Sequence, residues 1–198
     1  MARLATRATV PTLAISLVLA LVAGSALALH GRTAPAKAQQ VTPSDRASVV
    51  SAFFDAEVRG DVDAAVAQLA DNGVFISARA TGNCSQQAPC TDLASIRQNI
   101  QGTVAVHPCL TIRAIQVSGA VVTGQRETRS DLGRRNGIDR VLGTFIALVP
   151  RDKITFFANL DDAADPETAL NAAITAGTQP VGTPIPNPAT PCAGVSGA

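Results

Sequence analysis

The sequence predicts a single α+β domain in which three N-terminal helices pack on a curved, mostly antiparallel sheet, behind an N-terminal hydrophobic export segment. Apolar residues recur at helical spacing after residue 42, and they alternate with a period of two across residues 110–161. Turn-forming residues separate the alternating runs. The length of 198 residues suits one domain once the terminal segments are set aside. We therefore divide the chain into residues 1–28 (signal peptide or membrane anchor), 29–41 (linker), 42–177 (cone-shaped domain) and 178–198 (Pro-rich tail).

The N-terminus has the features of an export signal. Arg3 and Arg7 form a basic start, and residues 9–29 contain no charged side chain. The apolar centre at residues 13–23 precedes Ala26-Leu27-Ala28, a small-x-small pattern that predicts cleavage after Ala28. The uncharged run is also near the ~20 residues that a membrane helix needs, so an uncleaved anchor stays open. In either case we expect a secreted or extracytoplasmic protein of the cell envelope.

Four cysteines follow the export segment, and an even number in an exported chain predicts disulfides. We expect a Cys84–Cys90 bond, because the polar segment between them can bring its ends together. That pairing leaves Cys109 with Cys192. The alternative is a metal site built from His107, Cys109 and the other two cysteines. The tight C-x-x-C spacing of structural zinc sites is missing, so we predict no metal.

The first predicted helix follows residue 42. Thr42 can cap it, Pro43 suits its first position, and apolar residues then recur at helical spacing until Gly60 ends the element. Asp61 can cap a second helix, whose apolar face we expect to continue through Leu69. These two helices should cover one face of the sheet.

The strands come next, interrupted by a third helix. Asn72-Gly73 is predicted to turn the chain into a short strand at residues 74–78, and Thr91 or Asp92 can cap the third helix. Residues 131–137 are charged and end in Asn-Gly, which predicts a loop. The remaining predicted elements are strands at residues 110–117, 120–130, 138–149 and 153–161, and a short helix at residues 166–176.

Composition excludes some functions and leaves others open. There are 16 basic and 15 acidic residues, and the formal net charge is +1. The sequence therefore predicts no broad positively charged surface for a nucleic-acid partner. The chain contains neither Tyr nor Trp. We expect no cofactor. Between residues 178 and 198, five prolines with Gly and Thr among them predict an extended or disordered tail.

Two regions of the sequence resemble the SnoaL-like, or nuclear transport factor 2-like, superfamily. Residues 49–75 match its helix pair running into the first strand. Residues 124–162 match its sheet, with Gly143-Thr144-Phe145 before a tight turn and Lys153-Ile154-Thr155 after it. The resemblance implies a cone, or cystatin-like roll, with a cavity for a small molecule, and we expect a bacterial source. Fold does not dictate function.

Within that superfamily the sheet is most similar to the limonene-epoxide hydrolase branch. Those enzymes place Arg-x-Asp on one long strand and another Asp on the last strand, with a Tyr and an Asn that help to hold water. The family's arginine falls on Arg126, its partner aspartate on Thr128, and its last-strand aspartate on Asn159. Thr and Asn cannot act as carboxylate acid or base. The usual catalytic set is therefore incomplete, and the catalytic residues, if any, are unknown.

A shifted register is the alternative for catalysis. Arg129-x-Asp131 keeps the spacing, and Asp161 or Asp162 lies near the end of the last strand. Isomerase-type and dehydratase-type sites of the fold need a Tyr, which the chain lacks, and the lone His107 of the domain is expected to be structural or exposed.

Alternation on the strands places several of these residues on one face. The predicted ligand-binding residues are Arg126, Thr128, Phe157 and Asn159. They would receive a small apolar molecule that bears an acid or carbonyl group. The alternative is a filled interior in which Arg126 pairs with Glu57 or Asp55.

The opposite face of the last strand is also apolar, and a sheet that is apolar on both faces needs cover on both. A homodimer through this face is one cover, and the tail held by Cys192 is the other. The face consists of Ile154, Phe156, Ala158 and Leu160.

The sequence thus predicts an exported, small-ligand-binding or partner-binding cone domain without the usual catalytic residues. One alternative is a hydrolase or isomerase that uses Arg126 with a relocated acid such as Asp131 or Asp161. Another is a membrane-anchored accessory protein of an envelope complex.

Overall fold

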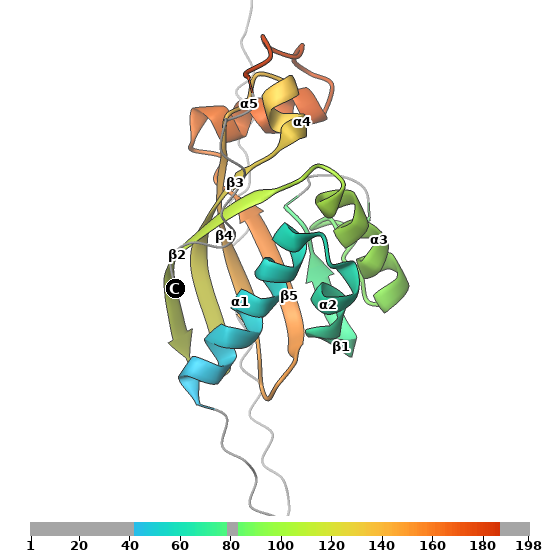
Figure 1. Ribbon diagram of the computed structural model, residues 1–198, viewed down its shortest axis with the longest axis vertical. Coiled ribbons are helices and arrows are strands. Elements are labelled where there is room, and N and C mark those ends of the chain that lie inside the picture. Colours follow the sequence, from blue (N-terminus) through green and yellow to red (C-terminus); the bar gives the residue numbers. More distant parts are fainter. Residues whose placement is uncertain (1–41, 79–82, 187–198) are drawn as a thin grey trace, which may run out of the picture. The chain divides into compact units, whose positions relative to one another are not determined.

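Residues 42–78 and 83–186 are described by the computed structural model of the chain, and they form one α+β domain. The export segment, the linker and Cys192 lie outside the described residues. Figure 1 shows helices α1, α2 and α3 on one side of a five-stranded sheet. The elements are α1 Pro43–Arg59, α2 Val62–Ala67, β1 Leu69–Ile76, α3 Leu93–Val104, β2 Cys109–Ser118, β3 Val121–Arg129, α4 Asp131–Arg135, β4 Val141–Leu148, β5 Ile154–Asp161 and α5 Pro166–Thr175.

The sheet has the strand order β1-β5-β4-β3-β2. Strands β2 to β5 form an antiparallel meander, and β1 pairs parallel to β5. The three helices that precede β2 pack against one face, as the sequence predicted. Helices α4 and α5 lie together near one end of the sheet (Figure 1).

Local signals explain the first helices. Thr42 and Asp45 form a reciprocal capping box at the start of α1, and Gly60 ends the helix in the left-handed conformation at φ 77°. Asp61 caps α2, and Asp92 rather than Thr91 caps α3. These polar side chains satisfy backbone N–H groups that a helix start otherwise leaves without partners.

The first strand differs from the prediction. Helix α2 ends at Ala67, and β1 already begins at Leu69, which the sequence placed on the helix. Leu69 pairs with Ile154 of β5, and the register shifts before Val74, so Asn72-Gly73 lies in an irregular part of the strand rather than in a turn before it. Parallel pairing with a buried strand outweighs the local turn preference here. Ile154, expected on the outer face, is fully buried at this point.

The segment 131–137 was predicted as a loop and contains a short helix instead. Ser130 caps α4, with its Oγ accepting from the Gly133 N–H at 3.1 Å. Strand β4 consequently begins at Val141, three residues later than expected. The tail packs here: the Gly182 N–H donates to the Asn136 carbonyl at 2.9 Å. Residues 180–186, the described end of the predicted tail, have no regular secondary structure.

Five of the six phenylalanines fill the space between α1 and the sheet. Phe53 lies 4.9 Å from Phe157 and Phe54 lies 5.1 Å from Phe145, measured between ring centroids, and Phe75 completes the cluster. We call these five residues the aromatic cluster. Gly124 makes room for it, because a Cβ atom there would lie 2.6 Å from the Phe145 ring. The apolar part of the interior is therefore a packed core.

The Cys84–Cys90 disulfide is present, as predicted. It closes the loop between β1 and α3, and Cys90 also forms a β-bridge with Phe75. Because these two sulfurs are bonded to each other, they are not thiolate ligands for the alternative metal site. No group of three or more potential metal-ligating His, Cys, Asp or Glu side chains occurs among the described residues. The Cys109–Cys192 pairing remains a prediction, since Cys192 lies outside them.

Removing this bond should lower stability. We expect the double variant Cys84→Ala/Cys90→Ala to lose about 2 kcal/mol of unfolding free energy, because a short closed loop no longer restricts the unfolded chain. Chemical denaturation of the oxidised proteins measures the difference. Gln86→Ala/Gln87→Ala, at two exposed positions of the same loop, is the control for changing its composition alone. An unchanged unfolding midpoint in the double cysteine variant would contradict the prediction.

Candidate functional site

Arg126 is the centre of a polar cluster at one end of the aromatic cluster. It lies on β3 with only 7% of its surface exposed. Its neighbour on β4 is Gly143, where a Cβ atom would lie 3.2 Å from Arg126 Nη2 and 2.5 Å from the Leu160 carbonyl oxygen. A glycine at this position lets the guanidinium group lie against the inner face of the sheet.

Two side chains accept hydrogen bonds from the guanidinium group. Nη2 donates to Asp161 Oδ1 at 2.5 Å, and Nη1 donates to Thr128 Oγ1 at 2.7 Å. Asp161 stands beside Arg126 because both residues are aligned with Gly143 on the intervening strand. Asn159, two residues before Asp161 on β5, projects to the same face. We call Glu57, Arg126, Thr128, Asn159 and Asp161 the polar cluster.

Glu57 brings a second carboxyl group to Arg126 from the helix side. It lies on α1 and is 4% exposed. Burial raises the pKa of Glu57 to about 8, and the attraction of Arg126 opposes the rise only in part. At neutral pH this carboxyl group therefore holds its proton. Burial also raises the pKa of Asp161, against the attraction and the hydrogen bond of Arg126.

Two buried atoms of the polar cluster lack a hydrogen-bond partner among the described residues. They are Arg126 Nε, a donor, and Asn159 Oδ1, an acceptor. An unpaired buried polar atom costs about 1–3 kcal/mol. Most buried polar atoms in proteins are paired, so these two stand out, together with Ser77 Oγ and Arg129 Nε outside the cluster.

The predicted site residues do not all belong to the polar cluster. Arg126, Thr128 and Asn159 share the inner face, whereas Phe157 is part of the aromatic cluster. Glu57, one of the two proposed partners of Arg126, faces it without a hydrogen bond between them. Among the described residues, no hydrogen bond or ion pair joins Asp55 to Arg126.

The alternative in which Arg129 and Asp131 replace the family's Arg-x-Asp does not bring these two side chains together in the structure. Asp131 lies at the start of α4, where its carboxylate pairs with His107 Nδ1 at 2.8 Å. Arg129 pairs with Glu127 at 2.9 Å and with Asp139 at 3.8 Å. The relocated acid that does reach Arg126 is Asp161. The sequence named Asp161 as one of two candidates, and alternation places it on the same face as Asn159.

A groove of about 570 Å³ lies over strands β2 to β5 at the same end of the sheet. Its lining includes Arg126 and Asp161, but most of its side chains belong to the outer face. The full lining is Arg113, Gln125, Arg126, Glu127, Arg140, Leu142, Gly143, Thr144, Leu160, Asp161, Asp162 and Ala163.

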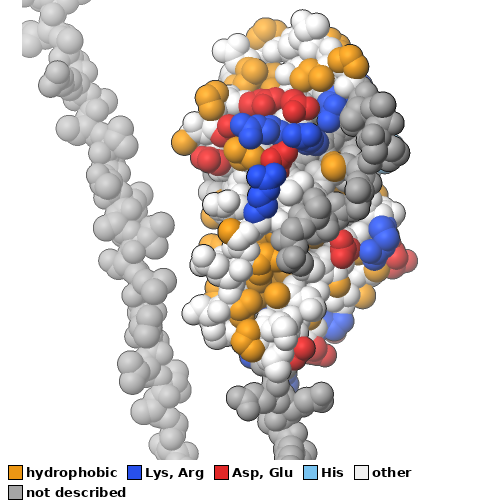
Figure 2. Space-filling view, turned by 60° about the vertical axis from the view of Figure 1, so that its left-hand side comes forward, with side chains coloured by type: hydrophobic (Ala, Val, Ile, Leu, Met, Phe, Trp, Pro, Cys, Tyr) orange, Lys and Arg blue, Asp and Glu red, His pale blue; other side chains and the backbone are white. Residues whose placement is uncertain are grey.

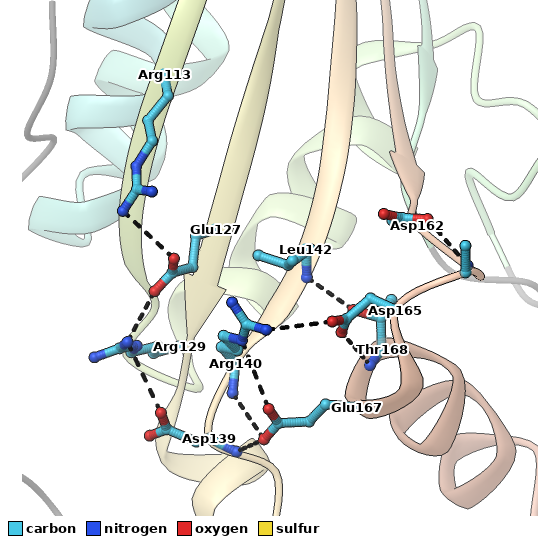
Figure 3. Close-up of polar contacts among 11 residues, drawn as sticks. Arg113, Glu127, Arg129, Asp139, Arg140, Leu142, Asp162, Asp165, Glu167 and Thr168 are labelled. Carbon is cyan, nitrogen blue, oxygen red and sulfur yellow. Dashed lines mark hydrogen bonds and ion pairs between the residues drawn. The ribbon is translucent and has the colours of Figure 1, made fainter.

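The charges around this groove are paired with one another. Figure 3 shows Arg113 of β2 reaching Glu127 of β3 at 3.6 Å, and Arg140 reaching Asp165 at 3.3 Å. Arg140 also approaches Glu167 of α5 at 3.7 Å. The arginines drawn there all have carboxylate partners, so the groove offers no strongly positive surface to an anion.

Apolar side chains gather beyond the charged band. On the face seen in Figure 2, acidic and basic side chains lie side by side, and hydrophobic side chains lie below them. Val121, Ile146 and Leu148 on the outer face of β3 and β4 are each more than one-third exposed. Within residues 42–78 and 83–186, no helix is both long and apolar enough to cross a bilayer.

Comparisons with known proteins support the fold. No protein-family model matches the sequence, and neither does any curated protein. An LEH-like epoxide hydrolase from M. tuberculosis aligns over 68% of this chain and 98% of its own, at 19% identity and a TM-score of 0.52. SalBIII, an epoxide hydrolase/cyclase-like enzyme of pyran ring formation in the polyether salinomycin, aligns over 64% and 97%, at 16% identity and a TM-score of 0.52.

A de novo designed protein with a curved β-sheet aligns equally far, over 68% of this chain and 98% of its own, at 12% identity and a TM-score of 0.50. The predicted fold, the cone of the SnoaL-like and nuclear transport factor 2-like proteins, is thereby confirmed. A designed protein among the similar structures illustrates that this likeness concerns the backbone and not the function.

Replacing Glu57 with Gln tests the buried carboxyl group. In the folded protein Glu57 keeps its proton up to about pH 8, whereas a glutamate in the unfolded chain loses its proton at about pH 4.3. The unfolding free energy of the wild type should therefore fall as pH rises between these values, because the unfolded state binds fewer protons. Glu57→Gln should remove that part of the slope.

Chemical denaturation at several pH values across this interval measures the effect. Asp55→Asn, on the same helix, is the control for removing a carboxyl group. Parallel pH profiles for the wild type and Glu57→Gln would contradict the prediction.

Proposed function

We propose that this domain is exported and binds a small, largely apolar molecule through a hydrogen-bonding group that the polar cluster receives. The observation that carries the proposal is the pair of unpaired buried atoms, Arg126 Nε and Asn159 Oδ1, on one face of the sheet. A ligand group that accepts from the first atom and donates to the second removes both penalties at once. Thr128 and Phe157 complete the proposed site.

The side chains favour binding over the hydrolysis that the resemblance implies. Thr128 uses its hydroxyl to accept from Arg126, at the position where the family's carboxylate is expected. Asn159 cannot gain or lose a proton near neutral pH. Neither residue can move the proton that an acid or base must move.

The proposal of export rests on the uncharged N-terminal segment and is supported by the Cys84–Cys90 disulfide. Disulfides form and persist mainly in oxidising compartments. Whether the segment is cleaved after Ala28 or anchors the protein in a membrane changes the mature mass and the location, but not the domain that follows.

Native mass spectrometry of the protein purified from its own host tests this function. We expect a small molecule to co-purify with the wild type and to be lost from Asn159→Leu, which removes the amide oxygen but keeps the side-chain volume. Because Asn159 Oδ1 is unpaired, the variant should be at least as stable as the wild type. Gln125→Leu, the same chemical change on the outer face of β3, is the control.

The spectra decide between the proposals. A wild-type protein that carries no small molecule, or an Asn159→Leu variant that keeps it, would contradict ligand binding in the polar cluster. The same spectra report the mature N-terminus. They also test a homodimer, which we propose through the outer face with Val121, Ile146 and Leu148. A complex with another polypeptide and no small molecule would favour the envelope accessory protein instead.

The pairing of Arg126 with Asp161 supports a second candidate, a hydrolase. Two carboxyl groups interact with the arginine, and burial raises the pKa of both. In this proposal Asp161 takes a proton from a water molecule whose oxygen attacks an epoxide carbon. The carbon–oxygen bond opens, and the ring oxygen takes the proton of Glu57, so that water is added overall. The name of the similar M. tuberculosis structure, an epoxide hydrolase, suggests the substrate class.

Cyclohexene oxide is a suitable probe for this candidate. If it is correct, diol formation should fall at least a hundredfold in Asp161→Asn, since the base is removed. Asp162→Asn, next along the chain, is the control, and circular dichroism checks that each variant is folded. Diol formation no faster than in buffer, or equal rates in wild type and Asp161→Asn, would rule the hydrolase out.

A further inference from the structure

Strand β1 forms one edge of the sheet, and β2 forms the other (Figure 1). An edge strand presents backbone N–H and C=O groups that can pair with another chain. In β2 the register shifts between Arg113 and Gln116, with Ala114 in the left-handed conformation at φ 51°, and such an irregularity hinders pairing along the edge. No register shift lies between Val74 and Ile76 of β1, so this edge needs another form of protection.

The disulfide-closed loop at residues 83–90 covers the edge of β1. The Phe75 N–H donates to the Cys90 carbonyl at 2.9 Å, and the Cys90 N–H donates to the Phe75 carbonyl at 3.0 Å. The Ser77 N–H donates to the Cys84 carbonyl at 2.6 Å. The two cysteines that form the disulfide therefore provide all of these backbone partners.

The disulfide also holds the loop in this position. Cys84 has φ 61°, in the left-handed region that a residue with a Cβ atom rarely adopts. Residues 86–89 are exposed, so packing between the two cysteines does little to fix the loop. Without the bond, the backbone preference at Cys84 and the exposure of the loop both favour its release.

We propose that the edge of β1 is an interaction surface for a second copy of this chain, and that the Cys84–Cys90 bond keeps this surface covered. Residues 74–78 are Val-Phe-Ile-Ser-Ala, a segment that favours a strand and contains no charge, Pro or Gly. Two such segments can pair antiparallel about a two-fold axis, and each then satisfies the backbone groups that the loop has left. This contact differs from the homodimer proposed through the outer face, because it uses backbone groups of the edge and is open only without the bond.

Amide hydrogen exchange of the peptide that contains residues 74–78, measured by mass spectrometry, tests the inference. The wild type is compared with Cys84→Ala/Cys90→Ala at two protein concentrations about a hundredfold apart. In the wild type, the protection of the Phe75 and Ser77 N–H groups should be the same at both concentrations. In the variant, it should be at least about tenfold weaker at the lower concentration and recover at the higher one, because a second copy replaces the loop by mass action.

Three further variants complete the test. Cys84→Gly/Cys90→Ala removes the same bond without a Cβ atom at φ 61°, and it takes the place of the first variant if circular dichroism shows that the first does not fold. Val74→Lys, added to either bond-free variant, brings like charges together across the paired β1 strands and should prevent the recovery of protection. Gln86→Ala/Gln87→Ala keeps the bond and should behave as the wild type does.

Equal protection at both concentrations in the bond-free protein would overturn the inference. If the amides stay protected, the loop keeps its place without the bond; if they stay unprotected, no second copy pairs with β1. Recovery of protection that persists with Val74→Lys would place the contact outside the β1 edge, and this result would also overturn the inference.

Discussion

The hydrogen-bonded ion pair of Arg126 with Asp161 is the contact on which the inner face of the sheet depends. An unpaired arginine at 7% exposure would carry a large desolvation cost. Asp161 supplies the opposite charge at 2.5 Å, and Gly143 supplies the space through which the two groups meet. The cation, its partner and the glycine come from three adjacent strands, so the sheet register itself places them together. Loss of any one of them would leave a buried charge or a clash.

The aromatic cluster fills the apolar space next to the polar cluster. Phe53, Phe157 and their neighbours pack at ring distances of about 5–6 Å and leave the apolar part of the interior filled. The proposed ligand is therefore confined to the end of the domain where Arg126 lies. The exposed apolar residues of β3 and β4 are on the other face of the sheet, so the proposed ligand site and the proposed homodimer contact use separate surfaces.

Strong local signals were enough to predict much of the fold. The capping box at Thr42 and the glycine at Gly60 marked α1, and alternation placed Arg126, Thr128 and Asn159 on one face. Helix α4 was missed because its cap, Ser130, follows an alternating run without a break in composition. Strand β1 was predicted too short because its first residues are held by pairing with β5, a contact that no local pattern records.

The site was harder to predict than the fold, and the reason is physical. The family resemblance directs attention to positions 128 and 159, where the sequence has Thr and Asn, and it suggests that the carboxyl groups around the arginine are lost. The structure places two carboxyl groups near Arg126, Asp161 two residues further along β5 and Glu57 from α1, and the sequence had offered each of them only as an alternative.

A buried cation requires a nearby negative charge but does not specify which residue provides it. The residue types at positions 128 and 159 therefore do not predict which charged groups surround Arg126 in the folded chain. Asp161 is the carboxyl group that forms a hydrogen bond with the arginine. Burial raises the pKa of the other, Glu57, to about 8, so the buried cation does not depend on both groups being charged.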